Sequence, residues 1–333
     1  MTIAQDDSRR IVVLGTGGTI AGVAQADGGY RAGQLTVETA LARALGTPTP
    51  LAVRSIALDP IDVTALPGQA HTPATWSLIA DAVRDAARRK DICGIVVLTG
   101  TDTLEELAYM LRLTVASTVP IAITGSMLPG DAPGSDAGEN VQSAIAYAQN
   151  PDSPVGVAVV LDQRIYPARG IAKLATRFPG AFGMPATHSG LALAQRSTRA
   201  GYRHGAESEF AALDLTALPR VDILYGYAGD PSPLAQAAHA AGAKGLVVAG
   251  VGGGNMHPRL EETLHEFQRT SGLHVVRASR IPGATVLPGA EFTDSDPCIP
   301  AGDLSPAQAR VLLILALAAG VPSADTHRVF AEY

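Results

Sequence analysis

Two short segments rich in glycine and threonine, each directly after an apolar run, contain hydroxyl groups that could act as nucleophiles. The first is Gly15-Thr16-Gly17-Gly18-Thr19, which follows residues 11–14, and the second is Thr99-Gly100-Thr101-Asp102-Thr103, which follows residues 94–98. Both runs are apolar on both faces, as in buried parallel strands. The carboxyl ends of such strands meet at one edge of the sheet, where α/β proteins bind ligands. We therefore expect Thr19, Thr101 and Asp102 to face one crevice.

The first segment also has three other interpretations. It could be a tight strand-to-helix turn, because glycine permits sharp changes in backbone direction. A dinucleotide fingerprint, G-x-G-x-x-G, would need glycine where the chain has Ile20, and a phosphate loop would need a Gly-Lys-Ser or Gly-Lys-Thr ending that does not occur here. The nucleotide interpretations are disfavoured, and the choice between a turn and a site depends on the second segment.

The second segment combines a helix start with more polar groups than a helix start needs. Thr103 and Glu106 have capping-box spacing, which predicts a helix that begins near Thr103. Capping explains one threonine. It does not explain Thr99, Thr101 and the adjacent Asp102 together, so this segment favours a chemical role.

Together the two segments resemble the motifs of the bacterial-type L-asparaginases, amidohydrolases that cleave the side-chain amide of asparagine and often of glutamine. The resemblance covers nearly the whole chain. Further matches are Tyr30, Gly125-Ser126-Met127, Lys173 after Arg169-Gly170, residues 249–255, and residues 307–313.

The resemblance implies a role for each matched residue. Thr19 is the first nucleophile and forms an acyl-enzyme, while Tyr30 assists from a mobile loop at residues 24–33. Thr101, Asp102 and Lys173 form a linked set, in which Asp102 also binds the α-ammonium group of the substrate. Whether Thr19 attacks the amide directly or Thr101 activates a water molecule stays open at this point.

Lys173 is the candidate base for this chemistry, since a threonine hydroxyl needs a proton acceptor to become nucleophilic. It is the only lysine between Lys90 and Lys244. A lysine accepts a proton only in its neutral form, which burial favours and a nearby carboxylate such as Asp102 disfavours.

The matches for substrate binding are less regular. The family has a serine and a polar residue after its second strand, and the aligned positions here are Leu58 and Asp59, with Ser55 and Thr64 as the nearest hydroxyls. Leucine cannot donate a hydrogen bond, and Asp59 would repel a substrate carboxylate. Either the alignment is displaced by a few residues, or substrate binding differs from that of the family. The predicted contacts from the remaining motifs are Thr101, Asp102, Ser126, Asn255 and Glu291.

The resemblance also implies an oligomer. Asn255 and Glu291 match positions that reach into the active site of a neighbouring subunit in the family, and the match of Glu291 is the weaker one. A homodimer or homotetramer with shared active sites follows as an expectation.

The alternation of strand-like and helix-like segments predicts an α/β fold with a mostly parallel sheet. Strands are expected at residues 11–15, 51–57, 94–98, 120–124 and 155–161, and helices at 72–89 and 104–116. Residues 196–220 lack an apolar period and are interpreted as a linker. The predicted organisation is a larger catalytic α/β domain at 1–195 and a smaller carboxy-terminal α/β domain at 221–333, closed by a helix from Ser305.

Composition limits the remaining function classes. The chain has 333 residues, of which 47% are hydrophobic and 17% charged, with a net charge of −6 and no basic stripe, which argues against nucleic-acid binding. The histidines do not cluster, so neither a metal nor another cofactor is expected, and Cys93 and Cys298 imply no disulfide framework. The polar amino terminus and the shortness of the apolar run at 311–321 predict a cytoplasmic protein without a membrane segment.

The leading hypothesis is therefore an asparagine amidohydrolase. The alternatives are the same chemistry on a modified amino acid amide and a non-catalytic amino-acid-binding α/β protein. Parallel assays on asparagine, glutamine and N-acetylated asparagine would distinguish them.

Overall fold

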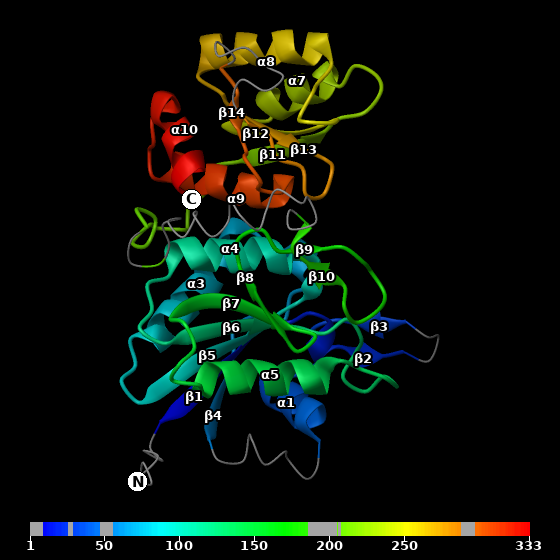
Figure 1. Cartoon of the computed structure of the whole chain (residues 1–333), viewed down its shortest axis with the longest axis vertical. Helices are drawn as coiled ribbons and strands as arrows, with labels where there is room; N and C mark the ends of the chain where they lie inside the picture. The colour runs from blue at the N-terminus through cyan, green and yellow to red at the C-terminus, as the bar shows by residue number, and fades with distance from the viewer. Residues whose placement is uncertain (1–8, 26–28, 47–55, 186–204, 206–207, 288–296) are drawn as a thin grey trace. The chain divides into compact units, whose positions relative to one another are not determined.

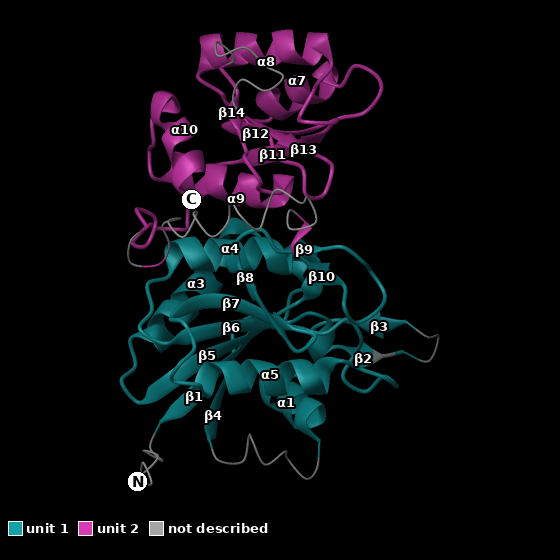
Figure 2. Cartoon of the chain, viewed as in Figure 1, with its two compact units in different colours: residues 1–183 teal, residues 184–333 magenta. Residues whose placement is uncertain are grey.

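A computed structural model describes residues 9–25, 29–46, 56–185, 205, 208–287 and 297–333. The chain divides into two compact units, Met1–Gly183 and Met184–Tyr333, which Figure 2 shows in different colours. Both units combine a parallel sheet with helices, so the predicted α/β class is confirmed.

Within the described residues, unit 1 contains a six-stranded sheet of order β4-β1-β5-β6-β7-β8, parallel except that β8 runs antiparallel to β7. The strands are β1 (Arg10–Gly15), β4 (Ala57–Asp62), β5 (Ile92–Leu98), β6 (Pro120–Thr124), β7 (Gly156–Leu161) and β8 (Arg164–Pro167). Small antiparallel pairs, β2 (Val23–Ala24) with β3 (Tyr30–Arg31) and β9 (Ala172–Lys173) with β10 (Phe182–Gly183), lie beside this sheet.

Helices cover both faces of the sheet (Figure 1). One face carries α3 (Pro73–Ala87) and α4 (Leu104–Thr114), and the other carries α1 (Val37–Leu45) and α5 (Ala137–Gln149). Because both faces are covered, the inner strands are apolar throughout: residues 11–14 of β1 and 95–97 of β5 have no exposed surface. This packing holds the strand ends, and the loops that follow them, in fixed positions.

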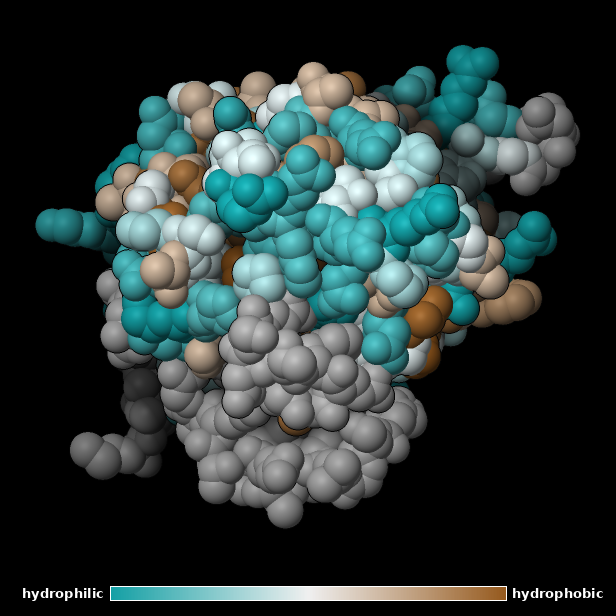
Figure 3. All heavy atoms as spheres, turned by 90° about the horizontal axis from the view of Figure 1, so that it is seen from above, coloured by the Kyte–Doolittle hydropathy of each residue, from teal (hydrophilic) through white to brown (hydrophobic). Residues whose placement is uncertain are grey.

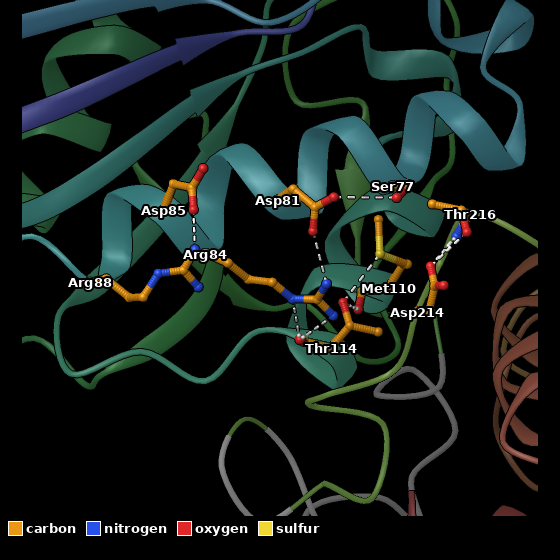
Figure 4. Close-up of polar contacts among 9 residues, drawn as sticks. All are labelled: Ser77, Asp81, Arg84, Asp85, Arg88, Met110, Thr114, Asp214 and Thr216. Atoms are coloured by element: carbon orange, nitrogen blue, oxygen red, sulfur yellow. Dashed lines mark hydrogen bonds and ion pairs between the residues drawn. The ribbon is translucent and has the colours of Figure 1, made fainter.

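Local sequence accounts for the ends of α3. The Thr72 hydroxyl accepts a hydrogen bond from the Thr75 amide, and Pro73 occupies the first turn, where its missing N–H leaves no hydrogen bond unmade. In the last turn, Arg84 donates from Nε and Nη2 to the carbonyl oxygen of Thr114, the final residue of α4 (Figure 4). One side chain of α3 thus satisfies an unpaired carbonyl at the end of α4.

The start of α4 differs in detail from the prediction. A 3₁₀ turn, η3 (Thr101–Thr103), leads directly into Leu104, so the helix begins where the capping-box spacing placed it. The Thr103 side chain, however, makes no capping hydrogen bond. Its hydroxyl packs against Gly68 instead, where an added Cβ would lie 2.3 Å from Oγ1.

Unit 2 is a second α/β layer structure. In its described part the strands β11 (Val221–Tyr225), β12 (Gly245–Gly250), β13 (His274–Ser279) and β14 (Ile299–Pro300) form a parallel sheet. Its helices are α7 (Ser232–Ala240), α8 (Pro258–Ser271), α9 (Pro306–Ala318) and α10 (Ser323–Glu332). The predicted helix after Ser305 is confirmed, with the Ser305 hydroxyl accepting from the Gln308 amide.

The apolar helix α9 is a core element, with eight of its residues, from Gln308 to Ala316, buried. No helix in the described part of the chain is both long and apolar enough to cross a bilayer. In the view from the side of α8, the coloured part of the surface is mainly hydrophilic, and its hydrophobic residues are scattered (Figure 3).

Some element boundaries in the structure differ from the predicted ones. The strand expected at 51–57 appears as β4 at Ala57–Asp62, and residues 51–55 lie outside the described residues. Residues 208–220, part of the expected linker, form turns within unit 2.

Candidate active site

The two threonine-rich segments lie at the same edge of the unit 1 sheet. β1 and β5 pair in parallel and end at Gly15 and Leu98, which are directly opposite in register. The first segment continues into a 3₁₀ turn, η1 (Thr19–Ala21), and the second into η3. The parallel register therefore carries Thr19 and Thr101 to one edge, as the sequence predicts.

Backbone packing between the two loops is direct. Gly18 has a φ of 86°, and its Cα hydrogen points at the Gly100 backbone, so that any side chain there would overlap it. On the other side of the second loop, Gly125 after β6 lies against the Thr99 carbonyl and the Thr101 methyl group. Glycine at these positions is what allows three strand-end loops to converge.

Thr19 is paired with a tyrosine. It is 6% exposed, and its hydroxyl donates to the Tyr30 phenolic oxygen over 3.0 Å. Tyr30 lies in β3, at the end of the small hairpin that follows η1, and is 47% exposed. Residues 26–28 of the predicted mobile loop lie outside the described residues.

Lys173 contacts both polar residues of the second loop. Its Nζ donates to Thr101 Oγ1 over 2.8 Å and to Asp102 Oδ1 over 2.7 Å. Its side chain is only 16% exposed, whereas that of Asp102 is 60% exposed. The lysine thus links a buried hydroxyl to a carboxylate that remains open to solvent, an arrangement suited to moving a proton at Thr101.

Glu105 is a residue that sequence reasoning missed. It lies in the first turn of α4, and its Oε2 accepts a hydrogen bond from the Lys173 main-chain N–H over 2.9 Å. Burial is the main cause that raises the Glu105 pKa to about 7. The only signal in the sequence is an acidic residue four positions after Thr101, at a helix start where acidic residues are common.

The loop after β6 is organised by Asp136. Its carboxylate accepts from the main-chain amides of Met127 and Leu128 and from Asn140 Nδ2, and Asn140 also donates to the Gly125 carbonyl. Ser126 is fully buried and donates its hydroxyl to the Leu128 carbonyl over 2.7 Å. The prediction that Ser126 contacts substrate is therefore corrected: its side chain stabilises the loop.

The predicted substrate contacts Leu58 and Asp59 lie elsewhere. They pair with Ile11 and Val12 in the first half of β1, several residues before the strand ends. Leu58 packs against the hydrophobic core, and Asp59 forms an ion pair with Arg89. Both assignments are wrong because the alignment placed the end of the second strand too early.

Another segment reaches the site from that side. The 3₁₀ turn η2 (Gly68–Ala70) packs against η3, and Gly68 is the buried residue whose Cα meets Thr103. Gln69 follows it and is exposed. At the end of β4 itself, Asp62 accepts the Val37 amide over 2.7 Å and so holds the start of α1. A cavity of 260 Å³ lies there, lined by Gly15, Ile20, Gly33, Asp62 and Thr64 among others.

In unit 2, Asn255 ends a glycine-rich loop after β12. An isolated bridge joins it to Val251, Ser279 donates to the Gly252 carbonyl over 2.6 Å, and Arg277 donates to the Gly254 carbonyl over 3.3 Å. Glu291 lies outside the described residues. Among the residues that the structure does describe, no three His, Cys, Asp or Glu side chains gather as a metal site would require.

Models of two domains of one protein family match this chain. The model for the asparaginase amino-terminal domain matches residues 10–203, and that for the glutaminase/asparaginase carboxy-terminal domain matches residues 220–330. The chain is 34% identical to an L-asparaginase 2 of Bacillus subtilis, over 98% of this chain and 87% of that protein. It is 32% identical to a glutaminase-asparaginase of Pseudomonas fluorescens, over 97% and 90%.

A similar solved structure is that of a probable cytoplasmic L-asparaginase from Campylobacter jejuni, with a TM-score of 0.84 and 31% identity. The match covers 98% of this chain and 100% of the other. With the family models spanning both units and the threonine loops at one sheet edge, the chain belongs to the asparaginase family.

Proposed function

We propose that the protein is an amidohydrolase that releases ammonia from the side-chain amide of L-asparagine. The observation that carries this proposal is the contact of Lys173 Nζ with Thr101 and Asp102, at the same sheet edge as the Thr19–Tyr30 pair. Relatives of similar length are named L-asparaginase and glutaminase-asparaginase. Both the chemistry and the family support hydrolysis of an amide over simple amino-acid binding.

Thr19 is the proposed nucleophile. Its oxygen bonds to the amide carbon, its proton passes by way of the Tyr30 oxygen to the departing nitrogen, and ammonia leaves a threonyl ester. The Lys173–Thr101–Asp102 set then activates a water molecule, which cleaves the ester, gives aspartate and returns the proton to Thr19. In this scheme both threonines take part, one in each half of the reaction.

Substrate binding is proposed for Asp102, whose exposed carboxylate suits an α-ammonium group, and for Gln69, which follows Gly68 at the edge of the site. Glutamine is the second candidate substrate, because a relative such as that of Pseudomonas fluorescens is named a glutaminase-asparaginase. The argument for a modified amide rested on Leu58 and Asp59, which lie away from this edge.

Assembly and location remain proposals. We expect a homodimer or homotetramer in which Asn255 and Glu291 complete the site of a neighbouring subunit. A cytoplasmic location is proposed by analogy with the probable cytoplasmic L-asparaginase of Campylobacter jejuni. The relatives differ in this respect, since one is a probable cytoplasmic protein and another, from Haemophilus influenzae, a probable periplasmic one.

The test is ammonia release from asparagine, glutamine and N-acetylasparagine, measured in parallel on the wild type and on Thr19→Ala. We expect asparagine to be preferred and the variant to lose about a thousandfold in kcat without a change in its melting temperature. Wild-type activity in Thr19→Ala would remove the nucleophile assignment, and no ammonia from any of the three would overturn the proposed function.

A further inference from the structure

Lys173 lies on a very short strand outside the main sheet. β9 has two residues and pairs only with the equally short β10 among the described strands, with Lys173 opposite Phe182. A two-residue ladder fixes little by itself. Contacts that cross from β9 to the segment 101–105 therefore help to set the position of Lys173 relative to Thr101.

These contacts hold Lys173 by hydrogen bonds at its side chain and at its main chain. At the tip of the side chain, Nζ donates to Thr101 and Asp102. At the main chain, the Lys173 N–H donates to Glu105 Oε2 over 2.9 Å. All three acceptors are side chains of one short segment, η3 and the first turn of α4, so the same five residues hold both ends of the lysine.

We propose that Glu105 is a positioning residue for the reaction, which holds the main chain of Lys173 so that its amine meets the Thr101 hydroxyl. This inference rests on the proposed function for the role of Lys173 itself. The hydrogen bond is charge-assisted while Glu105 is ionised, and such bonds are shorter and stronger than neutral ones. A displacement of about 1 Å at a reacting group can lower a rate about a hundredfold.

The surroundings of Glu105 make this grip sensitive to pH. Burial and the neighbouring charge of Glu106 raise its pKa to about 7, while the Lys173 amide and the Lys173 charge act in the opposite direction. Protonation near neutral pH would turn a charged acceptor into a neutral one. The grip on Lys173 is therefore expected to weaken as the pH falls below about 7.

The first test combines kinetics with amide exchange. In Glu105→Leu we expect kcat to fall about 10- to 100-fold with KM within about threefold, and the peptide containing Lys173 to exchange its amide hydrogens faster. Glu106→Gln serves as the control and should only lower the Glu105 pKa. At about pH 8.5, where Glu105 is ionised in both proteins, its kcat should stay within about twofold of wild type. Exchange does not require activity, so it tests the contact even if the proposed function fails.

The second test uses Glu105→Gln, which keeps the shape and a neutral acceptor. We expect the kcat of this variant to stay the same at every pH from about 5.5 to 8.5, at the value that the wild type has below pH 7. The rise in kcat that Glu105 ionisation gives the wild type near pH 7 should be missing. Unchanged exchange and kcat in Glu105→Leu would overturn the proposal. If Glu105→Leu does not fold, the proposal would be overturned by a Glu105→Gln variant whose kcat varies with pH near 7 as that of the wild type does.

Discussion

A Cβ atom built on Gly18 would lie 2.2 Å from the Cα of Gly100, so the two threonine loops touch through their backbones at these glycines. Gly18 also has a φ of 86°, which L side chains rarely adopt. The contact joins the loop of Thr19 to that of Thr101.

Gly18→Ala should therefore both destabilise the protein and disable it. We expect a loss of about 3 kcal/mol in the free energy of unfolding, from backbone strain plus overlap with Gly100, together with a large fall in kcat. Gly134→Ala is the matched control, because Gly134 has a φ of 74° but open space around it. Urea titration and ammonia release on both variants check this, and equal behaviour of the two would contradict it.

Two substitutions of Lys173 can show whether this residue acts as a base or only through its positive charge. Lys173→Met should lower kcat about a thousandfold or more, because it removes the contacts to Thr101 and Asp102. Lys173→Arg retains a cation but not a group that can act as a base, and we expect it to be nearly as inactive. Substantial activity of the arginine variant would mean that Lys173 acts by its charge.

Tyr30→Phe removes the oxygen that accepts the Thr19 hydrogen bond and little else, since Tyr30 is 47% exposed. We expect kcat to fall about 10- to 100-fold, with KM within about threefold and the melting temperature unchanged. Tyr227→Phe is the control, because Tyr227 is exposed to the same 47% and lies in unit 2. Steady-state kinetics on asparagine provide the measurement.

Asp59→Asn tests the corrected position of this residue. Asp59 pairs with Arg89, which also contacts Asp91, so the loss of one half-exposed ion pair should cost no more than about 1 kcal/mol. KM for asparagine should not change. A tenfold rise in KM would return Asp59 to the substrate site.

The burial of His274 should make the free energy of unfolding depend on pH. Burial lowers the pKa of this histidine from 6.5, and its Nδ1 lies 3.2 Å from the Thr326 hydroxyl. The unfolded chain takes up a proton near pH 6.5 while the folded chain does not, so stability falls as the pH drops through that value. Denaturant unfolding between about pH 8 and 5 should show a smaller loss for His274→Gln than for the wild type.

The inner strands were predictable and the edge strand was not, for a physical reason. β1 and β5 are buried on both faces, so their sequences are continuous apolar runs. β4 lies at the edge of the sheet, includes Pro60 and is largely exposed, so its sequence does not show where it ends. That gap produced the error at Leu58 and Asp59.

The site residues that belong to short sequence motifs were predictable. The loops of Thr19 and Thr101 follow apolar strands, and resemblance added Tyr30 and Lys173. Glu105 was missed because its contact with Lys173 joins residues 68 positions apart, and nothing local distinguishes it from an ordinary acidic residue at a helix start.

The sheet order has a consequence for how the protein is made. β1 lies between β4 and β5, so the strand that leads to Thr19 emerges early from the ribosome but finds both neighbours only after residue 98 has followed. Lys173 arrives later still. One edge of this apolar strand therefore stays unpaired until β5 has been made, a period in which binding by a chaperone would protect it from aggregation.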